Sequence, residues 1–255
     1  MLANSWIISE KCLLNYEQNV TQETLVFFSA IIQHKMPFVI LQEDHSLRKD
    51  ELVTYYSRKG LTGLTTRHFF SVADAAVNRL AALYPTKKRA AYIGGRGLEE
   101  IIQNSSYSVT WERPDWAFVS QDKNATYDDY SYLLNLAKHG TKIVAVEDVK
   151  ITKVGDTYHL GIGSIIDMLE QVSNTEVIWI TLPQPLIIGE ALTYLRQPKE
   201  NAIFVAANLS KEIECANRAQ MNSVFVGDTV LQEDIGLLKT YTPTYLVENL
   251  SGLLR

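Results

Sequence analysis

Short apolar runs alternate with longer amphipathic stretches along almost the whole chain. Residues 6–9, 38–41 and 202–206 form apolar runs, whereas residues 21–35 carry apolar side chains at helical spacing. Continuous apolar runs are typical of parallel strands that helices cover on both faces, and amphipathic stretches are typical of the covering helices. The pattern therefore predicts an α/β fold with a largely parallel sheet.

The alternation also predicts an order of elements. Pro37 and Gly60 end the first two expected helices. The pattern restarts after residues 84–88, which indicates a second domain, and it returns to the first pattern from residue 177. The expected strands are 6–9, 38–41, 69–70, 90–93, 116–120, 142–146, 177–180, 202–206 and 223–226; the expected helices are 21–35, 47–59, 71–83, 98–103, 127–139, 165–172, 187–196, 211–220 and 247–254, with a hairpin at 151–158.

Composition narrows the class of protein and of partner. The 255 residues are 46% hydrophobic and 21% charged, as is usual for a globular protein, and the net charge is -5. A chain without a dense Lys/Arg stripe is poorly suited to nucleic acid or to an anionic membrane. Two cysteines, Cys12 and Cys215, provide no disulfide framework, and the first residues do not resemble a signal peptide. We therefore expect a cytoplasmic protein.

One segment carries a family resemblance. The step Gly161-Ile162-Gly163-Ser164, with the strand and proline-bearing turn that follow, resembles the glycine-rich step of NagD-type phosphatases in the haloacid dehalogenase (HAD) superfamily. Residues 92–98, 114–119, 126–127 and 245–250 resemble further parts of that family in the same order. The resemblance implies a Rossmann-like core from 1–84 and 177–255, with an inserted α/β cap of the C2 type from 85–176.

The resemblance also implies where a phosphatase site lies. Parallel α/β sheets hold their sites at the carboxyl ends of the strands, here after Ile8, Leu41, Ile180 and Val205. The family begins with Asp-x-Asp-Gly-Thr, in which one carboxylate attacks phosphorus, the other transfers a proton, and both help to hold Mg²⁺. This chain has Ser9-Glu10-Lys11-Cys12-Leu13 there. Ser9 thus takes the nucleophile position and Lys11 the acid/base position.

The other motif positions are changed as well. Gln42 stands where the family has a phosphate-binding Thr or Ser, and Leu182 replaces a lysine that neutralises the phosphate. In the last motif Ala207 replaces a metal-binding aspartate, and Glu212 stands near the other. Val226-Gly227-Asp228-Thr229 offers a rival placement of that motif. We reject it because too little chain follows it for another helix, strand and helix.

These changes predict a protein that has lost the family's phosphatase activity and needs no cofactor, although the family uses Mg²⁺. It would act by binding an unknown small molecule or protein. One alternative is a hydrolase of small phosphorylated metabolites with atypical residues, either Ser9 activated by Lys11 or Glu43, Asp44 and His45 with a metal. The cap loop 146–149 and the glycine turn 94–97 offer no substitute site. A second alternative is a homo-oligomer subunit anchored by exposed aromatics, namely Trp111, Trp116 and Tyr130.

Overall fold

The computed structural model of the chain describes residues 4–227 and 232–254. The chain forms two compact units. We call the first the core unit; it contains Met1–Gln42, Lys49–Phe70 and Leu182–Arg255. We call the second the cap unit; it contains Glu43–Arg48 and Ser71–Thr181. The domain boundaries expected from the sequence, 85–176 for the cap, stay a prediction, and the compact cap unit takes in residues 43–48, 71–84 and 177–181 besides.

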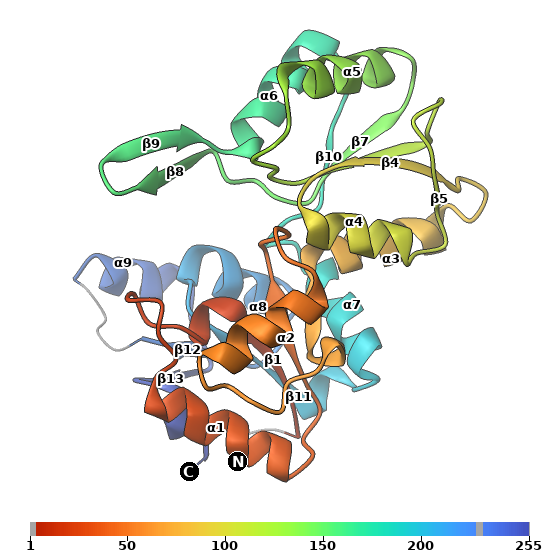
Figure 1. Cartoon of the computed structure of the whole chain (residues 1–255). Helices are drawn as coiled ribbons and strands as arrows, with labels where there is room; N and C mark the ends of the chain where they lie inside the picture. The colour runs from red at the N-terminus through yellow and green to blue at the C-terminus, as the bar shows by residue number, and fades with distance from the viewer. Residues whose placement is uncertain (1–3, 228–231, 255) are drawn as a thin grey trace. The chain divides into compact units, whose positions relative to one another are not determined.

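The core unit is built on a six-stranded sheet (Figure 1), which confirms the predicted α/β class. The strand order is β13-β12-β11-β1-β2-β3, and the pairs from β13 through β2 are parallel. Every residue of β1, β2 and β11 is buried, as the apolar runs predict. The strands are β1 (Ser5–Ser9), β2 (Phe38–Gln42), β3 (Phe69–Ser71), β11 (Ala202–Ala206), β12 (Ser223–Val226) and β13 (Tyr245–Val247).

Helices join the core strands. The first, α1, begins where the Thr21 hydroxyl accepts a hydrogen bond from the Thr24 amide at 3.2 Å. Its buried Phe27 packs edge-on against Trp6 of β1, with ring centroids 5.5 Å apart. Figure 1 shows α1 and α2 passing in front of the core strands. The core helices are α1 (Gln22–Gln33), α2 (Lys49–Arg58), α7 (Leu186–Leu195), α8 (Glu214–Arg218) and α9 (Gln232–Thr240), with short 3₁₀ helices at Glu10–Cys12, Thr66–His68, Lys199–Asn201 and Leu250–Leu254.

The cap unit has its own parallel sheet, in the order β10-β7-β6-β4-β5. Two of its helices begin with a capping box: Ser71 with Asp74, and Thr126 with Asp129. The strands are β4 (Arg89–Ile93), β5 (Ser108–Val109), β6 (Trp116–Val119), β7 (Lys142–Ala145) and β10 (Ile178–Trp179); the helices are α3 (Val72–Leu83), α4 (Arg96–Gln103), α5 (Tyr127–Lys138) and α6 (Ile162–Ser173).

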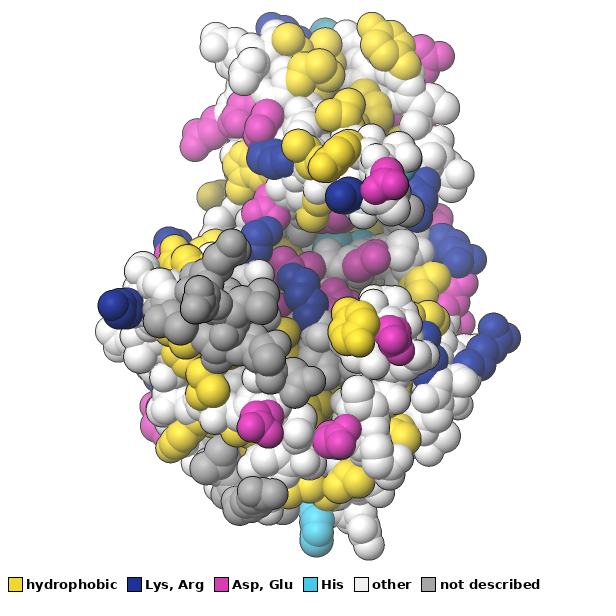
Figure 2. All heavy atoms as spheres, turned by 90° about the vertical axis from the view of Figure 1, so that its left-hand side faces the viewer, with side chains coloured by type: hydrophobic (Ala, Val, Ile, Leu, Met, Phe, Trp, Pro, Cys, Tyr) yellow, Lys and Arg dark blue, Asp and Glu magenta, His cyan; other side chains and the backbone are white. Residues whose placement is uncertain are grey.

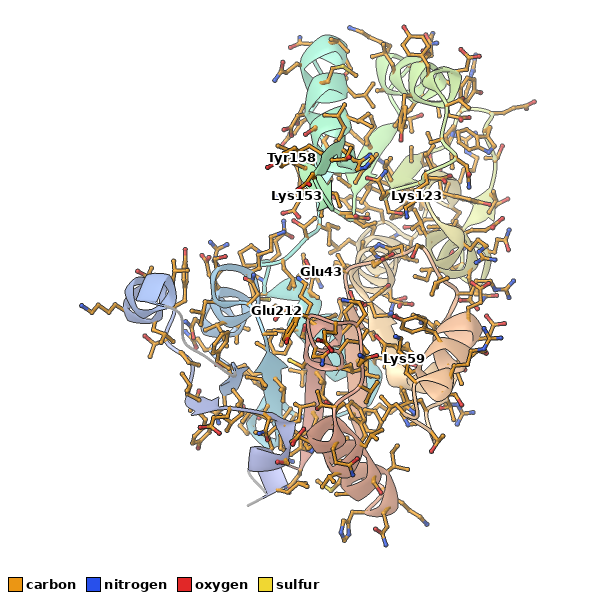
Figure 3. All side chains as sticks on the ribbon, turned by 60° about the vertical axis from the view of Figure 1, so that its left-hand side comes forward. Glu43, Lys59, Lys123, Lys153, Tyr158 and Glu212 are labelled. Carbon is orange, nitrogen blue, oxygen red and sulfur yellow. The ribbon has the colours of Figure 1, made fainter. Side chains whose placement is uncertain are left out.

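Two of the three aromatic residues expected as exposed anchors belong to the cap core. Trp116 is 2% exposed, so the expectation is wrong for this residue. Tyr130 packs partly buried against the cluster that includes Val119 and Leu133. Trp111 is 38% exposed and contacts Tyr132. Exposed apolar side chains also lie on the antiparallel hairpin β8 (Ile151–Val154) and β9 (Thr157–Leu160), where Figure 3 labels Lys153 and Tyr158.

Some elements differ from the sequence predictions. A π-helical turn at Leu209–Ile213 precedes the short α8, so the expected helix at 211–220 is wrong in its start and its length. The expected helix at 247–254 is instead the end of β13 followed by a 3₁₀ helix. The short strand β5 and the helix α9 were not predicted. Among the described residues, no helix is long and apolar enough to cross a membrane.

The glycines of the resemblance allow close approach of two backbone segments in the cap unit. The amide of Gly163 donates to the Val149 carbonyl at 2.9 Å. A β-carbon at Gly161 would lie 2.1 Å from the Val149 oxygen, and one at Gly163 would lie 2.5 Å from the Asp148 oxygen. The start of α6 therefore packs directly on residues 148–150, and no larger side chain fits there.

We expect Gly163→Ala to destabilise the protein by about 1 to 3 kcal/mol, because the new methyl group would press on a backbone oxygen rather than on a mobile side chain. Gly189→Ala in α7 is the matched control, since a β-carbon there meets no atom within 4 Å, and it should stabilise by about 0.5 to 1 kcal/mol. Denaturant unfolding measures both. Equal effects of the two substitutions would refute the close approach.

Candidate functional site

The carboxyl ends of three neighbouring core strands bring the predicted motif positions together. Ser9 and Gln42 are the last residues of β1 and β2, and Ala207 follows β11 directly. Because β1 lies between β2 and β11, these positions share one edge of the sheet. The predicted site residues that lie on these three segments are therefore neighbours in the core unit.

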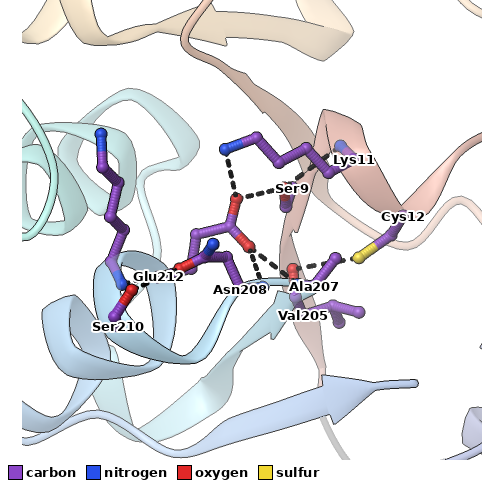
Figure 4. A network of polar contacts seen from close by, with 9 residues as sticks. Ser9, Lys11, Cys12, Val205, Ala207, Asn208, Ser210 and Glu212 are labelled. Carbon is purple, nitrogen blue, oxygen red and sulfur yellow. Dashed lines mark hydrogen bonds and ion pairs between the residues drawn. The ribbon is translucent and has the colours of Figure 1, made fainter. Parts of the chain in front are cut away.

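A buried carboxylate lies at the centre of this edge (Figure 4). Glu212 is 1% exposed, and its Oε1 accepts a hydrogen bond from the Ser9 hydroxyl at 2.6 Å. Its Oε2 accepts hydrogen bonds from the amides of Ala207 at 2.7 Å and Asn208 at 3.0 Å. Both oxygens are thus bonded by groups from two segments about 200 positions apart in the sequence.

The ammonium of Lys11 completes the surroundings of this carboxylate. Its Nζ lies 3.7 Å from Glu212 Oε1, and the Lys11 side chain is 43% exposed whereas that of Glu212 is 2% exposed. The Lys11 amide also donates to the Ser9 hydroxyl oxygen at 3.2 Å. The Ser9 hydroxyl therefore donates to the Glu212 carboxylate and accepts from the Lys11 amide, and these two hydrogen bonds fix its orientation.

The π-helical turn explains how Glu212 reaches this position. Asn208 caps the turn, because its side-chain oxygen accepts from the Lys211 amide at 2.8 Å. The wide turn lets the Glu212 carboxylate fold back onto the amides that end β11. The position of Glu212 thus follows from specific hydrogen bonds at the end of β11.

The remaining core positions that the resemblance singles out are occupied by Gln42, Leu182 and the neighbouring Cys12. Gln42 is buried and donates to Glu10 at 3.4 Å. Leu182 is 1% exposed and apolar, so it offers no positive charge to a phosphate. Burial, and next the Glu212 charge, raise the pKa of the Cys12 thiol well above its ordinary value. Cys12 is therefore no ready nucleophile.

The alternative site Glu43, Asp44 and His45 belongs to the cap unit, where His45 has a structural role. The Ala73 amide at the start of α3 donates to His45 Nε2 at 3.2 Å. Burial lowers the pKa of His45 to about 4, so the ring is neutral at pH 7. In residues 4–227 and 232–254, no group of three or more His, Cys, Asp or Glu side chains could hold a metal ion. The proposed metal at this loop therefore has no support.

The glycine turn at 94–97 is explained by the same loop. The Gly97 amide donates to the His45 carbonyl at 2.9 Å, and a β-carbon at Gly95 would lie 2.4 Å from the same oxygen. The turn thus packs against residues 45–47, and its Gly97 amide is already bonded to the His45 carbonyl. It does not resemble a phosphate-binding loop with free amides.

A second unusual carboxyl group lies in the cap unit. The side chain of Glu147 accepts from the Gln121 amide at 3.0 Å, where β6 and β7 end. Burial, and after it the negative charges of Asp44, Glu43 and Asp148, raise the pKa of Glu147 to about 7. The sequence offered no signal for this shift, because it depends on residues about 100 positions away.

The residues at the core edge do not fit Mg²⁺. This ion takes about six oxygen ligands, often from one or two carboxylates, and it is repelled by a neighbouring ammonium. Of the described residues at this edge, Glu212 provides a carboxylate whose two oxygens already accept from Ser9, Ala207 and Asn208, and Lys11 lies beside it. The expectation that the protein needs no cofactor stays a prediction.

Solved structures define the class of fold. NagD from Escherichia coli K-12 is similar at a TM-score of 0.85 with 18% identity over 98% of both chains. A p-nitrophenyl phosphatase from Archaeoglobus fulgidus gives 0.85 and 15% over 99% of this chain and 98% of that one. A putative p-nitrophenyl phosphatase from Bacillus subtilis gives 0.86 and 15% over 100% and 96%. The chain therefore has the same fold as NagD and these p-nitrophenyl phosphatases.

No family model matches the chain, and the relatives found by sequence are 15 to 23% identical. A dihydroxyacetone phosphatase of Corynebacterium glutamicum is 15% identical over 228 residues, 89% of this chain and 82% of the relative. The 5'-nucleotidase YutF of Bacillus subtilis is 20% identical over 189 residues, 73% of each. An acid sugar phosphatase of Staphylococcus epidermidis is 23% identical over 161 residues, 62% of each.

The sheet order also decides between the two placements of the last motif. β11 lies next to β1, whereas β12 lies one strand further away, so the segment after β11 is the one beside Ser9. Our reason for rejecting the rival was nevertheless wrong, because α9, β13 and a 3₁₀ helix do follow β12. The rival residue Asp228 lies outside the described residues.

Sequence reasoning missed the contact between Ser9, Lys11 and Glu212. One signal could have found it: Lys11 and Glu212 carry opposite charges at two motif positions that follow the expected strands 6–9 and 202–206. Each residue alone is a departure from its own motif, whereas the two together form an ion pair.

We expect His45 to make stability fall with decreasing pH. Its folded pKa lies below the ordinary value of 6.5, so the unfolded chain binds the proton more readily. The contribution of His45 to the free energy of unfolding, up to about 3 kcal/mol, is complete above pH 6.5 and is lost as the pH falls towards 4. Thermal unfolding of His45→Gln should lack this slope, whereas the control His139→Gln, at an exposed histidine, should keep it. A slope unchanged in His45→Gln would contradict the assignment.

We expect Glu147 to make stability fall with increasing pH, opposite to His45. Its folded pKa is raised from 4.5 to about 7, so its contribution is complete below pH 4.5 and is lost as the pH rises through 7. Between pH 5 and pH 8, this group should lower the free energy of unfolding of the wild type by about 1 to 2 kcal/mol, allowing for partial solvent screening. Glu147→Gln should lack this decrease. Unfolding free energies at pH 5 and pH 8 measure it, with the exposed Glu112→Gln as control. If both variants gain equally at pH 8, burial is not the cause.

Proposed function

We propose that this chain is a NagD-like member of the HAD superfamily that does not hydrolyse phosphate esters with Mg²⁺ and acts by binding. The observation that carries the proposal is the Ser9 hydroxyl at the nucleophile position, which donates to the buried Glu212 at 2.6 Å. Its ligand would be a small molecule or a protein. A cytoplasmic location remains part of this proposal, as does a partner other than nucleic acid or membrane; on the face in Figure 2, basic and acidic side chains are interspersed.

The reaction of the family needs three kinds of group, and the site offers different ones. A carboxylate nucleophile is replaced by a hydroxyl that already serves as a donor to another residue. A metal ion would meet the Lys11 ammonium beside Glu212. The phosphate would find buried Leu182 where a lysine neutralises its charge. These changes support loss of the reaction more strongly together than any one of them does.

A second candidate function is hydrolysis of small phosphorylated compounds by atypical residues. The comparisons favour this candidate by class, since the relatives are named as a dihydroxyacetone phosphatase, a 5'-nucleotidase and acid sugar phosphatases. One contact also favours it, because a carboxylate at 2.6 Å could accept the Ser9 proton. The structure does not support the pairing of Ser9 with the Lys11 side chain, whose described ion pair is with Glu212. Three other donors already share the Glu212 carboxylate, which makes it a poor base.

We expect purified protein to show no Mg²⁺-dependent hydrolysis of p-nitrophenyl phosphate, dihydroxyacetone phosphate, sugar phosphates or 5'-nucleotides. Phosphate release should equal that of Ser9→Ala, because the hydroxyl takes no part in a reaction. Turnover that Ser9→Ala abolishes would overturn the proposal and establish the second candidate. Turnover that persists in Ser9→Ala would also overturn it and would place the reaction on other residues.

Restoring the first motif should not restore the reaction. We expect Ser9→Asp/Lys11→Asp to remain inactive in the same phosphate-release assay, because Leu182 still supplies no positive charge and Ala207 no carboxylate. Circular dichroism would verify that the double variant folds. Activity in this variant would show that the other two motif positions are dispensable.

A further inference from the structure

The Glu212 carboxylate is a buried charge that the core unit must neutralise. Its side chain is 2% exposed, and a carboxylate that is removed from water is strongly destabilised unless it is paired and hydrogen-bonded. Hydrogen bonds from the Ser9 hydroxyl and from the Ala207 and Asn208 amides meet part of this need. These three donors are neutral, so they stabilise the charge without cancelling it.

The positive charge comes from Lys11, on the 3₁₀ helix directly after β1. The Lys11 side chain is partly exposed, and its aliphatic stem reaches inward while the ammonium lies 3.7 Å from Oε1. Figure 4 shows the Lys11 side chain extending over Ser9 towards Glu212. Lys11 thus follows β1, and Glu212 follows β11, the strand that pairs with β1.

We propose that the Lys11 ammonium is the resident cation of this site and occupies the role that a divalent metal ion would have beside Glu212. This inference rests on the proposed function and deepens it, because it says what the site holds instead of Mg²⁺. A tethered ammonium cannot dissociate, so the site has its full set of charges at every Mg²⁺ concentration. The site is then a permanent structural junction between β1 and β11.

The contacts of each oxygen explain why the two cations exclude one another. Oε1 is shared by the Ser9 hydroxyl and Lys11, and Oε2 by two backbone amides. A metal ion would have to displace at least one of these donors while lying within a few ångströms of the ammonium. Replacing Lys11 by an uncharged residue removes the repulsion and leaves a buried anion that attracts an external cation.

The test uses the full chain and three variants with different charges at the site. Lys11→Met removes the charge and keeps the stem, and Lys11→Arg keeps the charge. Lys11→Met/Glu212→Gln removes both charges, and it remains informative if Lys11→Met alone folds poorly. Lys123→Met, at an exposed lysine of the cap unit, is the matched control. Each protein is melted with and without MgCl₂ or MnCl₂, and bound Mn²⁺ is measured by loss of the free-ion electron paramagnetic resonance signal.

We expect wild type, Lys11→Arg and Lys123→Met to bind no Mn²⁺ and to melt at the same temperature with and without the metals. Lys11→Met should melt several degrees lower without metal and recover part of that loss in millimolar Mg²⁺ or Mn²⁺. The double variant should be more stable than Lys11→Met and should not respond to metal, because neither charge remains.

Stoichiometric Mn²⁺ binding by the wild type, or a melting temperature that Mg²⁺ raises in it, would overturn the inference. A Lys11→Met variant as stable as Lys123→Met would overturn it too, as would a double variant no more stable than Lys11→Met. These outcomes are distinct from failure of the proposed function. Phosphate release by a wild type that binds no metal would refute the loss of activity and leave the tethered cation in place.

Discussion

A buried carboxylate at the junction of two parallel strands is the constraint on which the site depends. Glu212 approaches β1 from the π-helical turn after β11, and its oxygens accept from Ser9, Ala207 and Asn208 beside the Lys11 ammonium. A buried anion tolerates few neighbours: it needs donors on both oxygens and a nearby positive charge. The identities of Ser9 and Lys11 follow from that need, because a carboxylate at either position would leave like charges side by side.

Steric and electrostatic requirements fall on different residues of the chain. Gly161 and Gly163 lie where backbone segments meet too closely for a β-carbon, and Thr126 forms a capping box with Asp129. These requirements follow from the fold and hold whatever the site does. Under the proposed function, Ser9, Lys11, Leu182 and Ala207 stand at positions where the family's chemistry needs charge. The fold itself does not depend on those charges, and it is similar to that of NagD and the p-nitrophenyl phosphatases at 15 to 18% identity.

The sequence predicted the elements well where burial alone decides them and poorly where a specific contact does. The buried strands β1, β2 and β11 followed from their apolar runs. The expected helix at 211–220 is present but was wrong in its start and length, because a π-helical turn, in which the Glu212 carboxylate bonds back to the end of β11, forms its beginning. The site residues were identified one by one, but their contacts depend on the sheet order, which brings residues 9 and 212 together. The pKa shifts in the cap unit have the same origin, since burial by distant residues causes them.

The most direct test of the account is a crystal of the protein soaked in manganese and phosphate, with data collected for the anomalous signal of Mn²⁺. The account predicts no anomalous peak within coordinating distance of Glu212, and Lys11 in contact with that carboxylate as it is here. A peak bound to a Glu212 oxygen, with Lys11 displaced and phosphate beside Ser9, would contradict the tethered cation and reopen the case for catalysis.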